Sequence, residues 1–125
     1  MKLDLSRVSY DGKFYDFGGG RLKIRPYPAT RNEIAFKDGA VIFSGDAGWD
    51  MFDYCLEAWE GVTDAEGKEL KLTKAIKKQI YDFRLGVATL PDGKETTMAD
   101  FVLATARART SEIEEDVKKD RKSVV

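Results

Sequence analysis

The chain has 125 residues, a formal net charge of −1, one cysteine and no histidine. This length fits one folded domain, and the near-neutral charge argues against a protein dedicated to nucleic acids or anionic membranes. Without histidine, Ser–His and Cys–His nucleophile pairs and most zinc sites are excluded. No run of 18 apolar residues is present and a lone cysteine forms no intramolecular disulfide, so we expect a cytoplasmic protein with no membrane span.

The N-terminal part of the chain predicts a β-hairpin. Residues 13–17 are rich in aromatic side chains, and residues 21–25 alternate between polar and apolar. Aromatic content and a period of two are both typical of a half-buried strand, and the three glycines at 18–20 suit the connecting turn. Pro26 ends the second strand because proline lacks a backbone N–H. A weaker strand is predicted at 7–10.

A second hairpin is predicted immediately after the first. Residues 33–36 and 40–43 are apolar β-formers on either side of Asp38 and Gly39, and an Asp-Gly turn between such runs is a strong hairpin signal. The sheet region over about residues 7–45 should therefore hold about four antiparallel strands. One face of that sheet must be covered by the helices that follow.

The next segment predicts a first helix, between N-cap candidates at 44–46 and Gly61 as the residue that ends it. Its large apolar residues recur at helical spacing. They are Trp49, Phe52, Leu56 and Trp59. This spacing places them on one face of a helix, which is the pattern of a core-facing stripe.

A second helix is predicted to begin after Thr73, whose hydroxyl suits an N-cap, and to end at Gly86. Its apolar stripe recurs every three or four residues and should face the core. The stripe consists of Leu72, Ile76, Ile80, Phe83 and Val87. Residues 91–93, Pro-Asp-Gly, then predict a turn.

A third helix is predicted from Thr97, with Asp100 completing an approximate capping box. It completes a helical region over about residues 46–110. The charged tail over about 111–125 has three open interpretations: an exposed helix, a segment that pairs with another chain, or a frayed end. The sequence thus predicts one α+β domain, with a small N-terminal antiparallel sheet packed against a three-helix C-terminal part.

Each motif that could suggest a catalytic or binding site is better explained by a structural role. The glycines at 18–20 precede a strand and lack the spacing of a phosphate-binding loop. The acidic residues of the first helix have no histidine or other convergent ligands for a metal, and Cys55 has no histidine partner. We therefore expect no catalytic residue, no cofactor and no metal; a small enzyme based on carboxylate or tyrosine chemistry is the least favoured alternative.

Residues 56–78 resemble a known family. They read Leu-Glu-Ala-Trp-Glu-Gly-Val-Thr-Asp-Ala-Glu-Gly-Lys, then Leu70 and Thr73-Lys-Ala-Ile-Lys-Lys. This is similar to tail assembly chaperones of long-tailed phages and prophages, which carry an apolar helix ending in W-x-G-V, an acidic turn with D-x-x-G-K and a capped helix. Arg25-Pro26 and the later Asp100–Leu103 stretch add to the resemblance, which spans roughly residues 21–107.

The resemblance implies a non-enzymatic protein that binds the tape measure protein, helps the tail tube protein to assemble and is absent from the mature virion. It also implies action in the host cytoplasm, and we expect self-association. The alternative is a structural virion component, such as a tail-tube or head–tail connector subunit. Apolar residues on the second faces of the two helices are the candidate partner-binding residues; the alternative is that they are core residues, which face the sheet on one side and the third helix on the other. They are Met51, Tyr54, Ala58, Tyr81 and Leu85.

Overall fold

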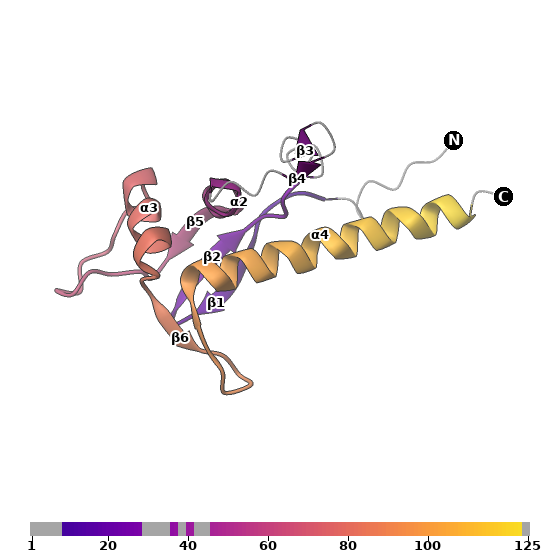
Figure 1. The fold of residues 1–125 in the computed structure, drawn as a ribbon. Helices are drawn as coiled ribbons and strands as arrows, with labels where there is room; N and C mark the ends of the chain where they lie inside the picture. Colours follow the sequence, from indigo (N-terminus) through magenta and orange to yellow (C-terminus); the bar gives the residue numbers. More distant parts are fainter. Residues whose placement is uncertain (1–8, 29–35, 38–39, 42–45, 124–125) are drawn as a thin grey trace.

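The computed structural model describes residues 9–28, 36–37, 40–41 and 46–123 of the chain. The elements, in chain order, are β1 (Lys13–Phe17), β2 (Gly20–Ile24), β3 (Phe36–Lys37), β4 (Ala40–Val41), α2 (Asp46–Cys55), β5 (Leu56–Glu60), α3 (Lys74–Phe83), β6 (Val87–Thr89), β7 (Glu95–Thr97) and α4 (Met98–Ser123). This confirms the predicted α+β class, with small antiparallel sheets beside three helices (Figure 1).

The first predicted hairpin is confirmed. β1 and β2 pair antiparallel from Lys13 opposite Ile24 to Phe17 opposite Gly20. The turn between them uses positive φ at Gly18 and Gly19, a conformation that most other residues avoid. β3 and β4 also pair antiparallel, as the second hairpin predicts, but most of residues 33–43 lie outside the described residues. Of the weak strand predicted at 7–10, residues 7 and 8 lie outside the described residues, and residues 9 and 10 are not in a strand.

The third strand of the main sheet, whose order is β1-β2-β5, comes from a segment that the sequence predicts as helix. The first helix, α2, ends at Cys55, and residues 56–60 pair with β2 instead. The prediction of a helix through Trp59, capped by Gly61, is therefore wrong. An open strand edge on β2 offers backbone hydrogen bonds that local periodicity does not reveal.

A β-bulge explains why the helical pattern was misleading. Ile24 lies opposite Leu56, but Lys23 lies opposite Ala58, so Glu57 is an extra residue in β5. The extra residue shifts the alternation and brings Leu56 and Trp59 to the same face of the sheet. Apolar residues three apart on a bulged strand thus imitate one stripe of a helix.

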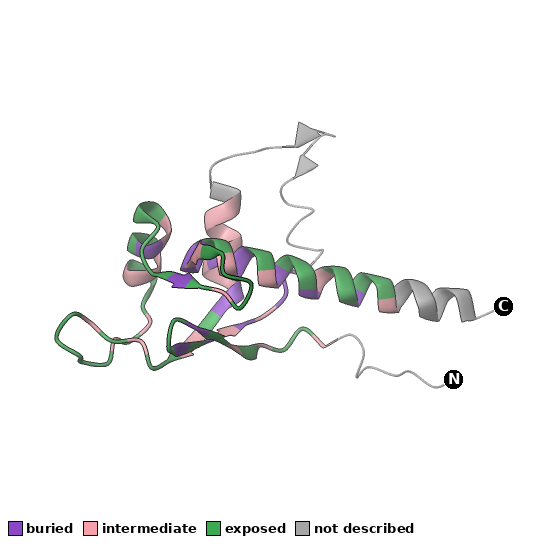
Figure 2. Ribbon diagram, turned by 90° about the horizontal axis from the view of Figure 1, so that it is seen from below, coloured by how far each residue is buried: buried purple, intermediate pink, exposed green. Residues whose placement is uncertain are grey.

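The long helix α4 runs along one face of the sheet and continues beyond it (Figure 1). Fully buried residues of the core come from the strands, α2 and α4. Figure 2 shows the buried residues of these elements in purple. They include Leu22, Ile24, Phe52, Cys55, Leu56 and Val102. Cys55 is thus a buried side chain of this core, which fixes α2 and α4 relative to the sheet.

Polar contacts begin α4 and attach its middle to the end of β2. Thr97 caps the helix as predicted, accepting the backbone N–H of Asp100 at 3.2 Å. Near its middle, the buried Arg109 donates from Nη1 to the backbone oxygen of Ile24 at 2.9 Å, and Thr110 Oγ1 accepts from the backbone N–H of Tyr27 at 3.2 Å. Of the three interpretations of the tail, the structure shows a helix that continues to Ser123.

The second predicted helix is confirmed as α3, but its end differs from the prediction. Thr73 Oγ1 accepts the backbone N–H of Ile76, so the N-cap is correct. The helix ends at Phe83, three residues before Gly86, and Val87 begins the β6–β7 hairpin around the predicted Pro-Asp-Gly turn. Phe83 and Val87 are therefore not core residues, as the apolar stripe predicted, but lie on the surface.

Candidate protein-docking site

An apolar pocket of about 310 Å³ lies between α3, the end of β5, the segment at 62–70 and the start of α4. Ile76 and Ile80 of α3 form one wall, and Trp59 lies on another. The remaining lining residues are Val62, Thr63, Leu70, Gln79, Leu85, Gly86 and Met98. Such a lining binds apolar groups, because burying apolar surface is worth about 25 cal/mol per Å².

Three large apolar residues at alternate positions where α3 ends are exposed, and the middle one, Leu85, lines this pocket. Phe83 keeps 73 % of its surface exposed, Leu85 48 % and Val87 61 %. Single exposed apolar residues need no explanation, but three in succession next to an apolar pocket form a patch of the kind that marks interaction sites. We call these residues, together with the pocket, the α3–β6 patch.

The end of α3 directs these side chains outward. Arg84 adopts a left-handed conformation with φ of 50°, and the N–H of Leu85 bonds to the oxygen of Ile80 at 3.1 Å. Gly86 also has a positive φ, and its oxygen accepts the N–H of Met98 at 2.7 Å. The turn is therefore fixed by backbone hydrogen bonds, so that exposure of Phe83 and Leu85 is a property of the fold.

The opposite wall of the pocket is fixed in a similar way. Trp59 donates its indole N–H to the backbone oxygen of Leu70 at 2.8 Å, and Leu70 donates its N–H to Val62 at 2.9 Å. At the tip of the loop, Asp64 Oδ1 accepts the N–H groups of Glu66 and Lys68, each at 2.9 Å. These bonds give the loop a defined shape and hold the pocket open on one side.

The other side of α3 packs against α2. The ring of Tyr81 lies 5.7 Å from that of Phe52 and 5.8 Å from that of Trp49. Lys77 donates to the backbone oxygen of Asp53 at 2.8 Å and lies 3.4 Å from its carboxylate. Three further cations engage this side: Lys74 near Asp53, Lys78 over Trp49 and Arg84 over Tyr81. The basic residues of α3 thus turn away from the pocket.

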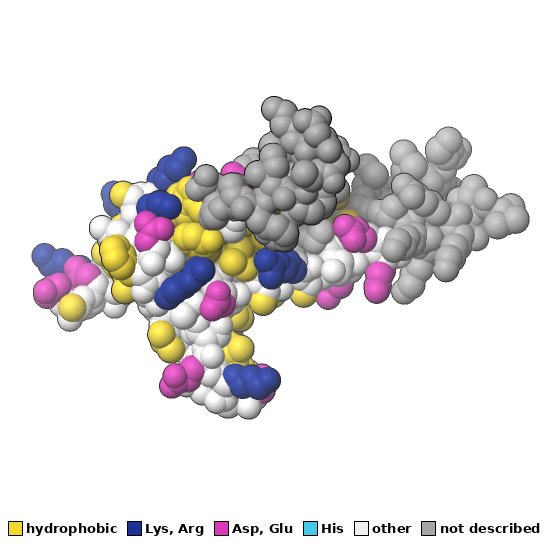
Figure 3. All heavy atoms as spheres, viewed as in Figure 1, with side chains coloured by type: hydrophobic (Ala, Val, Ile, Leu, Met, Phe, Trp, Pro, Cys, Tyr) yellow, Lys and Arg dark blue, Asp and Glu magenta, His cyan; other side chains and the backbone are white. Residues whose placement is uncertain are grey.

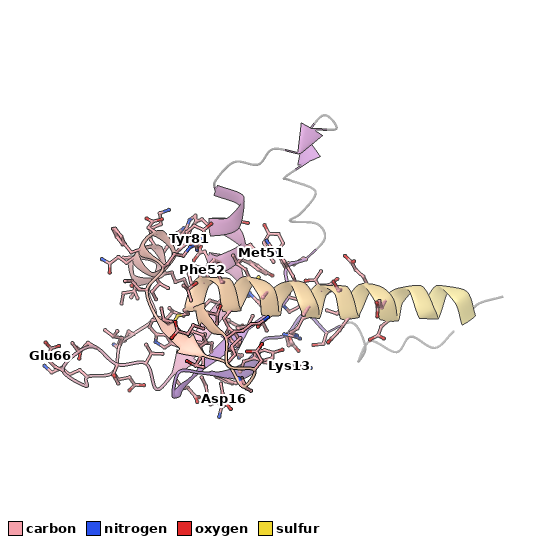
Figure 4. The ribbon with its side chains drawn as sticks, turned by 60° about the horizontal axis from the view of Figure 1, so that its bottom comes forward. Lys13, Asp16, Met51, Phe52, Glu66 and Tyr81 are labelled. Carbon is pink, nitrogen blue, oxygen red and sulfur yellow. The ribbon has the colours of Figure 1, made fainter. Side chains whose placement is uncertain are left out.

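The five predicted partner-binding residues do not form one surface. Tyr81 lies at the junction of α2 and α3 against Phe52, whereas Met51, also on α2, lies away from α3, as Figure 4 shows. Tyr54, on α2, stacks with Arg25, whose guanidinium carbon lies 3.8 Å from the ring centroid. Ala58 is on β5 opposite Lys23 and not on a helix. Leu85 alone of the five lines the pocket.

Phe83 and Val87 were not predicted as candidates, because their spacing placed both on the inward stripe of a longer helix. The sequence feature that indicates their exposure is Arg84-Leu85-Gly86, because a glycine shortly after the last helical residue allows the chain to turn. Figure 3 shows hydrophobic side chains on the surface over α3 and β6, and more of them where α3 meets α2.

The described residues contain no group of three or more His, Cys, Asp or Glu side chains that could hold a metal ion. Among the helices of that same part of the chain, none is both long and apolar enough to cross a membrane. No protein-family model, curated protein or solved structure matches the chain.

Proposed function

We propose that the chain is a non-enzymatic tail assembly chaperone of a phage or prophage, which binds the tape measure protein and assists tail tube assembly. The α3–β6 patch is the observation that supports it: an apolar pocket with exposed Phe83, Leu85 and Val87 is suited to holding apolar segments of another protein. The resemblance of residues 56–78 supplies the biological setting.

The fold departs in one respect from what the resemblance implies. The segment that precedes Gly61 is strand β5 rather than an apolar helix, while the acidic turn and the capped helix after it are present. In our proposal, β5 and the turn serve as the rigid wall of the pocket. The chaperone acts in the host cytoplasm, by contact alone, and leaves before the virion is complete.

Co-expression with the tape measure protein of the same phage or prophage tests this function. The tape measure protein should be soluble with the chain and insoluble without it, and Leu85→Gln should reduce the soluble fraction. Tyr10→Gln is a matched control, because the exposed fraction of Tyr10, 45 %, is similar to the 48 % of Leu85, and Tyr10 does not line the pocket. Recovery of the chain in stoichiometric amounts from purified tails would contradict the proposal and favour a structural virion component.

A further inference from the structure

We propose that the α3–β6 patch binds a basic amphipathic helix, that is, a helix with an apolar stripe flanked by Lys or Arg. The inference rests on the proposed function and adds the chemistry of the segment that is bound. It follows from the apolar pocket and its acidic surroundings.

The size and lining of the pocket suit side chains rather than an extended strand. About 310 Å³ is near the lower end of the range for pockets that bind small molecules or anchoring side chains. β6, the strand next to the patch, has only three residues, which is too short an edge to template an added strand. A helix presents apolar residues at i, i+3 and i+4 to such a pocket without needing backbone pairing.

Acidic residues flank the patch on two projections of the fold. The 63–69 loop, with Glu66 at its end, extends from one wall of the pocket, and the β6–β7 hairpin extends from another (Figures 1 and 4). The loop carries Asp64, Glu66 and Glu69 against Lys68, a net charge of −2. The hairpin carries Asp92 and Glu95 against Lys94, a net charge of −1. Both projections thus favour a cationic partner.

Lys71, just after the loop, brings the net charge of residues 63–71 to −1, but the cations of α3 do not offset the acids at the pocket. Lys77 is held by Asp53, and Lys78 and Arg84 lie over the rings of Trp49 and Tyr81 on the α2 side of α3. On the pocket side, α3 presents Ile76, Gln79 and Ile80, which carry no charge. A helix in the pocket therefore meets an apolar floor with acidic residues on either side.

Two designed helical peptides test this directly. They share one leucine stripe and differ only in the flanking residues, which are lysine in one and glutamate in the other. Fluorescence anisotropy with the full chain should show the lysine peptide binding about tenfold more tightly at low ionic strength. The difference should narrow as salt screens the charges over a length of about 8 Å at physiological ionic strength.

Two sets of variants locate the binding site. Leu85→Gln should weaken the lysine peptide about tenfold or more, whereas Tyr10→Gln should leave its affinity within about twofold. Replacing Glu66, Glu69 and Glu95 together by Gln should remove most of the preference for lysine, while Asp64 is kept because it holds the loop. The matched control neutralises three exposed acids of α4, Glu112, Glu114 and Glu115, and should leave the preference unchanged.

Three results would overturn the inference. They are equal binding of the two peptides, binding that Leu85→Gln does not weaken, and self-association of the chain that Leu85→Gln abolishes, which would make a second copy the occupant. The proposed function fails separately. A chain that keeps the tape measure protein soluble but shows no peptide preference refutes only the inference, and a chain with the preference but no effect on solubility refutes only the function.

Discussion

The two sides of α3 differ in what covers them. Toward α2, Tyr81 contacts Phe52 and Trp49, and Lys77 bonds to Asp53. Toward the pocket, Ile76 and Ile80 border an open apolar space, and Phe83 extends into solvent. A helix of ten residues is marginal by itself, so the α2 side must supply most of the packing that holds it. That arrangement leaves the other side free for a partner without loss of the fold.

This difference predicts that the same substitution, Phe→Ala, lowers the free energy of unfolding much more on the α2 side than on the pocket side. Phe52 is fully buried, and its truncation leaves a cavity beside Trp49 and Tyr81. We expect Phe52→Ala to lower the free energy of unfolding by about 3–5 kcal/mol, measured by urea denaturation.

Phe83→Ala is the matched control for Phe52→Ala. Because Phe83 is 73 % exposed, its truncation should change the free energy of unfolding by no more than about 0.5 kcal/mol. Equal losses for the two variants would show that the pocket side of α3 is covered in the folded protein, and the comparison would fail.

An effect between those of Phe52→Ala and Phe83→Ala is expected at the start of α3. Thr73→Ala removes the hydroxyl that accepts the N–H of Ile76 at 3.2 Å and should cost about 1 kcal/mol in urea denaturation. Thr73→Ser keeps a capping hydroxyl and should cost much less. If the serine variant is as unstable as the alanine variant, the cap is not what begins this helix.

Elements with local signals were predictable from the sequence. The Thr73 cap, the Pro-Asp-Gly turn and the glycines between β1 and β2 each depend on contacts a few residues apart. Capping and turn chemistry fix backbone conformation over that range, so the sequence carries the information directly. The α+β class followed from the predicted hairpins and helices.

The features that escaped prediction depend on residues far apart in the chain. Residues 56–60 form a strand because β2, more than thirty residues earlier, offers an edge, and the bulge at Glu57 imitates helical spacing. The pocket was missed for the same reason: it joins Trp59, Ile76 and Met98, which no local pattern brings together. Leu85 was predicted as a binding residue, but the sequence does not reveal which residues surround it.

The effect on stability expected at Leu85 is as small as that of Phe83→Ala, and it tests whether the patch is free in the isolated chain. Its backbone N–H stays bonded to Ile80 whatever the side chain, and 48 % of its surface is already exposed. Leu85→Gln should therefore change the free energy of unfolding by at most about 0.5 kcal/mol, as should the control Tyr10→Gln. A loss above about 2 kcal/mol that depends on protein concentration would mean that another copy covers Leu85. A small change together with weakened peptide binding would separate the binding role of Leu85 from any role in the core.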